Sequence, residues 1–78
     1  MEYIIHEYQT NAAGDTAIVT PEQRNDYYEA LSIFLYKKSV AANSTVEIHS
    51  GELVTKNGDQ LDKFCFTMEE KRRARGET

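Results

Sequence analysis

The longest apolar-rich stretch of the chain is YYEALSIFLYKKSVAA at residues 27–42, and its spacing predicts an amphipathic helix. At about 100° per residue, an apolar arc of roughly 140° has the width of a stripe that faces a sheet. We expect this arc to be the core face of the helix, and it contains Tyr27, Ala30, Leu31, Phe34, Leu35, Ala41 and Ala42. Lys38 lies near the end of the arc, where its aliphatic stem can cover apolar surface while the ammonium reaches water.

Two start signals precede this helix. TPEQ at residues 20–23 has the form of a capping box with proline at the first helical position, and Asp26 is followed three residues later by Glu29. QRND, between the two signals, has no apolar side chain that could anchor a turn. We therefore predict a helix from about Asp26 to Ala42, which leaves open a short turn at Pro21. The polar NST that follows ends the helix.

Four shorter runs rich in β-branched and aromatic residues are typical of strands. They lie at residues 3–10, 16–20, 45–55 and 60–68. Alternation in the first run places Ile4, His6 and Tyr8 on one face and Tyr3, Ile5 and Glu7 on the other. The turn-like NAAGD separates the first two runs, so we expect them to form a hairpin.

The last two runs are joined by Asn57-Gly58, which predicts a second hairpin. A type I′ turn needs a positive φ at both central residues, and Asn-Gly is the pair that best tolerates it. The alternation within the third run changes phase between Ile48 and Leu53, and Gly51 lies at the change. We therefore expect a β-bulge at Gly51.

These elements predict an α+β fold of the order ββαββ, or βαββ if residues 16–20 stay irregular. One helix packed across one face of a small antiparallel sheet is the simplest arrangement that buries both apolar surfaces. Residues 1–68 are expected to form this single domain. Residues 69–78 are expected to be a charged, flexible tail, since a terminal run with so much charge buries nothing.

Chain length makes association with another chain the expected source of added stability. The chain has 78 residues, and a domain of this size buries only about 60% of the surface that its unfolded chain exposes. Small folds compensate with disulfides, a metal or association, and Cys65 is the only cysteine. The lone cysteine, with no basic leader and no long apolar run near the N-terminus, predicts a cytoplasmic protein without a membrane span.

A second apolar stripe of the predicted helix is the candidate interface. Ile33, Tyr36 and Val40 lie within about 60° of one another, nearly opposite the expected core face. We expect them to meet another chain, most simply a second copy in a two-fold homodimer. Alternatively, the stripe is tolerated in solvent, or the tail or residues 11–25 cover it. The open edge strands of the sheet are a rival interface.

Few residues could carry chemistry. His6 and His49 could meet Cys65 across the sheet, but an activated thiol needs an exposed cysteine beside a base. Cys65 lies between Phe64 and Phe66, where a small, buried or half-buried residue is expected. The histidines and carboxylates lack metal-ligand spacing, and the glycines form no phosphate-binding pattern. We therefore expect no enzymatic activity, no metal and no cofactor.

The basic run KRRAR near the C-terminus supports an alternative function. A net charge of −4 argues against a protein that binds nucleic acid over its whole surface. The run itself could contact nucleic-acid phosphates with salt-sensitive affinity, through Lys71, Arg72, Arg73 and Arg75. Nearby glutamates weaken its field, and the run contains no aromatic residue that could stack on a base.

The order of motifs adds a resemblance. YIIHEYQTNAAGDTAIVTP, a helix containing EALSIF, the junction AANSTVEIHS and a short closing hairpin extend over roughly residues 3–66. In this order the chain resembles small uncharacterised proteins encoded in prophages and mobile elements of gut Firmicutes. TNAAGDTA and His49-Ser50 match the usual pattern of that family, whereas Leu35 stands where its helix often has a polar residue, frequently histidine.

The resemblance implies no catalytic residues, because that family has no established activity. A mobile-element origin fits an accessory protein that acts by binding. The sequence thus predicts a small, non-enzymatic binding or structural protein that forms a homodimer through Ile33, Tyr36 and Val40.

Overall fold

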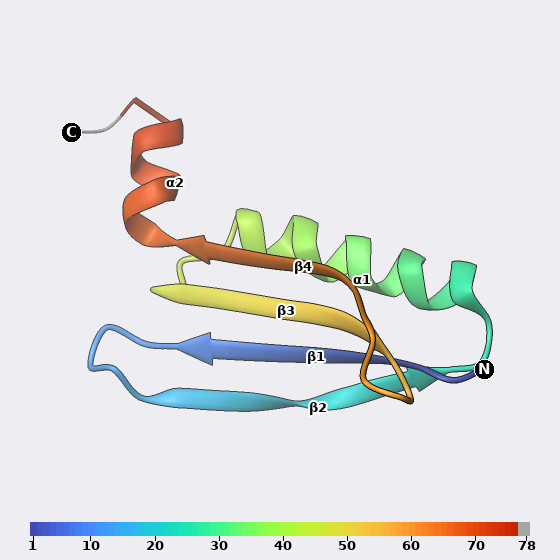
Figure 1. Cartoon of the computed structure of the whole chain (residues 1–78). Helices are drawn as coiled ribbons and strands as arrows, with labels where there is room; N and C mark the ends of the chain where they lie inside the picture. The colour runs from blue at the N-terminus through green and yellow to red at the C-terminus, as the bar shows by residue number, and fades with distance from the viewer. Residues whose placement is uncertain (77–78) are drawn as a thin grey trace.

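The computed structural model describes residues 1–76, which form a four-stranded antiparallel sheet with two helices. The elements are β1 (Tyr3–Thr10), β2 (Thr16–Arg24), α1 (Tyr27–Ala42), β3 (Ile48–Thr55), β4 (Gln60–Thr67) and α2 (Met68–Ala74). The strand order is β2-β1-β3-β4, and α1 lies across one face of the sheet (Figure 1). The predicted α+β fold is confirmed in its ββαββ form, and residues 16–20 belong to a strand.

The directions of β2 and β3 explain why a helix connects them in the chain. Both strands pair antiparallel with β1, which lies between them, so they run in the same direction. The chain leaving β2 must therefore return along the sheet before β3 begins, and a helix over one face is the usual connection. Asp26 caps this helix, as predicted, and its carboxylate accepts a hydrogen bond from Glu29 N–H at 2.9 Å.

Both predicted hairpins form, but the turn between β3 and β4 is not of type I′. Gly58 has a φ of +91°, and no residue other than glycine within residues 1–76 has a positive φ. Gly58 N–H donates to Thr55 O at 2.9 Å, and Thr55 N–H donates to Asp59 O at 2.9 Å. This pattern belongs to a three-residue loop in which a type I turn precedes a left-handed glycine.

Gly51 does not form the predicted bulge. β3 keeps one register across Gly51, which lies opposite Glu7 of β1 and Phe64 of β4. The glycine is needed for space: a Cβ atom would lie 2.6 Å from the Phe64 ring and 3.0 Å from His6 O. An aromatic ring that folds over a glycine on the neighbouring strand is a recognised way of filling such a gap.

The register shifts lie on the two edge strands. In β4 the shift falls at Leu61, and in β2 it falls at Thr20-Pro21, where two residues lie opposite His6. Proline is tolerated on an edge strand because its missing N–H would face solvent. The shift also changes the phase of β2, so that Val19 and Glu22 lie on the same face of the sheet.

The hydrophobic core lies between α1 and the face of the sheet that it covers, which we call the inner face. Its fully buried members are Ile5, Ala30, Phe34, Ala41, Leu53 and Phe64. The helix is rotated relative to the predicted core face: Leu35 is 47% exposed, whereas Ile33 packs against the core. The rotation places Lys37 over the inner face, where it reaches Glu7.

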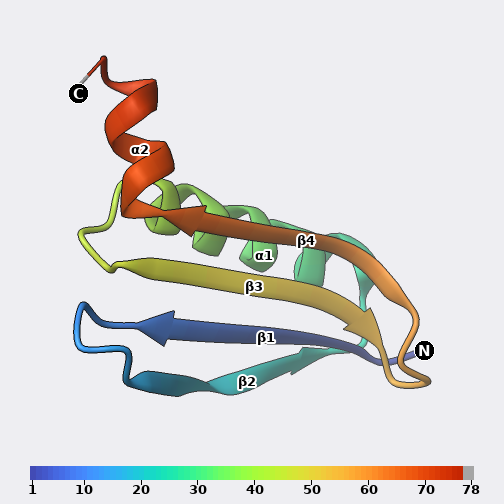
Figure 2. The same ribbon diagram turned by 60° about the vertical axis from the view of Figure 1, so that its left-hand side comes forward.

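The opposite, outer face of the sheet has no helix over it (Figure 2). Ile18 of β2 and Ile48 of β3 are 71% and 38% exposed there. Cys65 is also exposed, so the expectation that it is buried or half-buried is wrong. Phe64 and Phe66 occupy the inner face, and strict alternation turns the residue between them outward.

The second helix, α2, lies where the sequence predicts a tail that buries nothing. Figures 1 and 2 show it rising steeply from the end of β4. Thr67 caps it by accepting a hydrogen bond from Glu70 N–H at 3.1 Å. The expectation is wrong for Lys71, which is buried. Within residues 1–76, neither helix is long and apolar enough to cross a membrane.

We predict that Gly51→Ala destabilises the fold by about 1–3 kcal/mol, the usual effect of adding a methyl group to a packed core. The Phe64 ring cannot move freely, because it packs against Phe34 and Phe66 with ring centroids 5.5 and 5.7 Å away. Urea unfolding measures the loss. The double change Gly51→Ala/Phe64→Leu should recover part of it, and strictly additive losses would contradict the proposed clash.

Candidate functional site

The three residues of the predicted interface lie on one side of α1, which we call the α1 flank. Ile33, Tyr36 and Lys37 line a surface hollow of about 420 Å³ together with Glu22 of β2. Lys37 Nζ lies 3.1 Å from Glu22 Oε2, so this side of the helix faces β2. Val40 follows Tyr36 one helical turn later.

Ile33, Tyr36 and Val40 differ in their solvent exposure. Tyr36 is 71% and Val40 48% exposed, whereas Ile33 is half-buried against the core. Most of Tyr36 and about half of Val40 therefore stay exposed within residues 1–76. The opposite side of α1 also exposes apolar surface that the sequence analysis missed, at Tyr28 (77%) and Leu35.

Beneath the helix, a buried ionic network connects the inner face of the sheet to α1. Glu7 of β1 accepts a hydrogen bond from Lys37 Nζ at Oε1, over 2.7 Å. Its other oxygen, Oε2, lies 2.6 Å from Nε2 of His49 of β3. Since a carboxylate can only accept, the Nε2 proton of His49 must point toward Glu7.

The network continues from His49 to α2. His49 Nδ1 lies 3.3 Å from Ser44 Oγ, and Ser44 Oγ also lies 3.0 Å from Ala41 O at the end of α1. Lys71 Nζ donates to Ser44 O at 2.8 Å and to Ser44 Oγ at 3.1 Å. A continuous chain of polar contacts therefore runs from β1 through β3 to the short second helix.

Glu7, His49 and Ser44 have the residue types of a catalytic triad, but not its geometry. His49 is 2% exposed, and both of its ring nitrogens have partners. A nucleophilic site needs a base within reach of the serine and an open position for the reacting atom. Ser44 Oγ instead contacts Lys71 and Ala41 O. The arrangement links structural elements, and the buried His49 ring has no nitrogen left open to a reacting group.

The pKa values in this network follow from burial and pairing. Burial alone would raise the pKa of Glu7, but the hydrogen bonds from Lys37 and His49 outweigh it and lower the pKa below its ordinary value of 4.5. Burial alone would lower the pKa of Lys37, but its bonds to Glu7 and Glu22 raise it above 10.5. Glu7 and Lys37 are therefore both charged at neutral pH.

Lys71 has the opposite shift. Burial lowers its pKa, repulsion from Arg75 adds to the effect, and attraction to Glu47 opposes it. Its two hydrogen-bond acceptors belong to Ser44 and are neutral. A buried ammonium without a close carboxylate gains less from folding than a paired one does.

The four cations of the basic run therefore have different surroundings. Lys71 is 6% exposed and points inward, so it does not face solvent with the other cations. Arg73 forms an ion pair with Glu69 at 2.5 Å. Arg72 and Arg75 are exposed. His6 and His49 are also separated, because they lie on opposite faces of the sheet.

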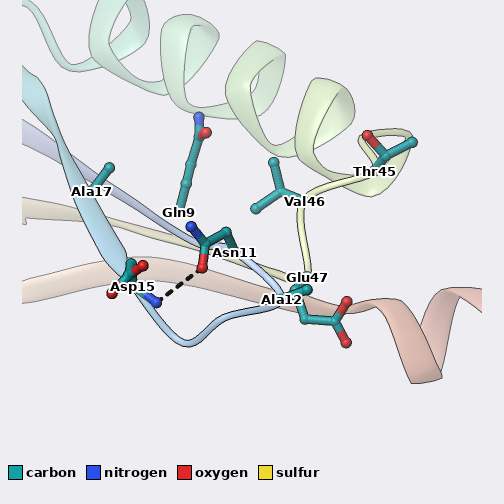
Figure 3. Close-up of a pocket in the computed structure, with 8 residues that line it drawn as sticks. All are labelled: Gln9, Asn11, Ala12, Asp15, Ala17, Thr45, Val46 and Glu47. Carbon is teal, nitrogen blue, oxygen red and sulfur yellow. Dashed lines mark hydrogen bonds between the residues drawn. The ribbon is translucent and has the colours of Figure 1, made fainter.

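A further hollow, of about 300 Å³, lies between the β1–β2 turn and the segment after α1 (Figure 3). It is lined by Gln9, Asn11, Ala12, Asp15, Ala17, Thr45, Val46 and Glu47. Gln9 points toward α1 and Glu47 away from it (Figure 3). Asn11 Oδ1 accepts hydrogen bonds from Ala13 and Asp15 N–H, both at 3.0 Å. Its side chain therefore shapes the turn.

Within residues 1–76, no three His, Cys, Asp or Glu side chains are grouped so that they could hold a metal ion. Comparison with known proteins gives no match, whether to protein-family models, to curated proteins or to solved structures.

We predict that Glu7 makes the fold sensitive to acid. Because its pKa is lower in the folded chain, its contribution is complete above about pH 4.5 and is lost as the pH falls through the folded pKa. Urea unfolding from pH 7 to pH 3 should show a smaller loss of stability for Glu7→Gln than for the native chain. The exposed Glu70→Gln is the control. Equal pH dependence in all three would contradict the assignment.

We predict different losses of stability when Lys37 and Lys71 are replaced. Lys37→Met leaves the Glu7 carboxylate with one fewer partner and should cost about 3 kcal/mol. Lys71→Met keeps the apolar stem and removes a charge that burial disfavours, so it should cost less than about 1 kcal/mol. Thermal and urea unfolding at pH 7 compare the two variants. A larger loss for Lys71→Met than for Lys37→Met would show that the contacts of Lys71 with Ser44 matter more than the Glu7 pair.

Proposed function

We propose that this chain is a non-enzymatic binding protein that acts as a homodimer, with the α1 flank in its interface. The observation that carries the proposal is the exposure of Tyr36 and Val40 next to the half-buried Ile33. Tyrosine is enriched in protein interfaces and among the residues that contribute most to binding. A domain of this size also gains from the added burial.

Charge on the α1 flank is compatible with self-association. Lys37, the cation at its border, is already paired with Glu7 and Glu22. The remaining border residue of the hollow is Ser32, which is uncharged. Two copies that approach through this surface therefore bring no unpaired like charges together, although the chain as a whole is acidic.

A binding role is also supported by the closed geometry of the polar network. The histidine of the Glu7–His49–Ser44 chain has no access to solvent, so the best-connected titratable groups stabilise the fold. A cytoplasmic location and a mobile-element origin remain part of this proposal, supported by the lone cysteine and by the resemblance of the motif order.

The alternative, nucleic-acid binding through the basic run, has less support. Lys71 is turned into the protein and Arg73 is paired with Glu69. Arg72 and Arg75 are then the cations of this run with the fewest competing contacts, and each phosphate contact contributes separately to salt-dependent affinity.

We predict that Tyr36→Glu dissociates the dimer without unfolding the chain. Tyr36 is 71% exposed, so the change should leave the monomer stable, while a buried carboxylate in the interface should weaken association at least about tenfold. Light scattering after size-exclusion chromatography, over a range of concentrations, measures the mass. Leu35→Glu, on the other side of α1, is the matched control. A native chain that is monomeric throughout would refute the homodimer.

A further inference from the structure

The structure points to a specific geometry for this assembly. We infer that β2 pairs antiparallel with β2 of the second copy around Ile18, which joins the two sheets into one continuous sheet. The inference rests on the proposed homodimer and adds the strand edge that accompanies the α1 flank.

The two edges of the sheet differ in how well they are protected from pairing. Natural edge strands are protected by charged side chains, bulges or proline. β4 has Asp62 and Lys63 in its middle and a register shift at Leu61. In β2 the shift and the proline come only after Thr20, and the segment TAIVT at 16–20, which we call the β2 edge, contains no charge.

The β2 edge is also symmetric about its centre. Antiparallel pairing with a copy of itself around Ile18 places Thr16 opposite Thr20, Ala17 opposite Val19, and Ile18 opposite Ile18. Thr–Thr and β-branched pairs are favourable across strands. A two-fold axis requires a surface that complements itself, and this segment meets that requirement.

The backbone of Ile18 is oriented for such pairing. The β1–β2 hairpin is closed by Asn11 N–H donating to Asp15 O at 3.0 Å. In an antiparallel ladder every second pair exchanges hydrogen bonds, which makes Gln9–Ala17 the next such pair. Ile18, opposite Tyr8, then directs its N–H and C=O away from β1 and toward the open edge.

The α1 flank lies on the side of the helix that faces β2. Lys37 reaches Glu7, which lies opposite Val19, and Tyr36 and Lys37 line a hollow with Glu22, two residues beyond the β2 edge. A two-fold axis at Ile18 brings the α1 flanks of both copies to the same side of the joined sheet, where they face each other.

Both surfaces are needed to form an interface of ordinary size. The five residues of the β2 edge extend over only about 17 Å. A single strand of this length buries less than the roughly 800 Å² that each partner usually buries in a stable interface. Because α1 packs on Ile5 of β1 and Leu53 of β3, each helix would lie about two strand spacings from the two-fold axis. With strands about 4.8 Å apart, the two helices would be about 19 Å from each other, farther than the 8–10 Å of direct helix packing. Large side chains such as Tyr36 suit the space between them.

A cross-link tests this geometry. In a Cys65→Ser background, Ile18→Cys places two thiols on the axis, where opposite residues have Cα atoms about 4.5–5.5 Å apart, within the range for a disulfide. We expect a covalent dimer under mild oxidation at micromolar concentration, formed at least about tenfold faster than by Leu61→Cys in the same background. Leu61 is 45% exposed and lies on the other edge.

The outcomes separate this inference from the proposed homodimer. A native dimer that Tyr36→Glu dissociates, combined with no faster cross-linking of Ile18→Cys, overturns the β2 pairing and leaves the α1 interface standing. A native chain that is monomeric at all concentrations overturns both. Fast cross-linking that is slowed by adding Tyr36→Glu supports one interface made of both surfaces.

A charge substitution tests the inference without a disulfide. Ile18→Lys should shift the chain to monomer, and because Ile18 is 71% exposed, circular dichroism should show an unchanged fold. Ile48→Lys is the matched change on the outer face, where Ile48 is 38% exposed. If Ile48→Lys dissociates the dimer and Ile18→Lys does not, the copies stack through their outer faces and the inference is wrong.

Discussion

The buried Glu7 carboxylate determines how the other elements are arranged. One of its oxygens is bound by Lys37 of α1 and the other by His49 of β3. A carboxylate removed from water is unfavourable unless it is paired and hydrogen-bonded, so the rotation of α1 and the register of β1 on β3 are fixed together. That rotation leaves Leu35 in solvent and turns Tyr36 toward β2. The proposed interface is therefore a consequence of an ion pair inside the fold.

Local signals in the sequence predicted much of the fold. The cap at Asp26, the turn around Gly14 and the Asn57-Gly58 hairpin each depend on residues close in sequence, and each lies where predicted. Helix α2 had a similar local signal, Thr67 followed by Glu70, which the high charge of the segment concealed. The exposure of Cys65 was also predictable, because alternation fixes it once Phe64 and Phe66 are assigned to the core.

The candidate site was less predictable, because it depends on contacts between distant residues. The predicted core face of the helix does not include Lys37, since a lysine is expected in solvent unless a partner is known. Its partner, Glu7, lies 30 positions away, and no local pattern connects them. The Gly51 bulge failed for a related reason: Ile48 lies on the outer face and His49 takes the buried inner position, so the alternation of β3 continues unbroken through Gly51 to Leu53. The sequence alone suggested Ile33, Tyr36 and Val40 as an interface and the edge strands as its rival, but it could not relate the two surfaces to each other.

The charges and register shift of β4 also limit how many chains can join one sheet. A chain whose two sheet edges both pair with other copies can add further copies at each end, and the result is a filament of indefinite length. In the proposed dimer, Asp62, Lys63 and the shift at Leu61 would leave only the β2 edge open to pairing. Association would then stop at two chains, because the dimer would have no further open edge that pairs.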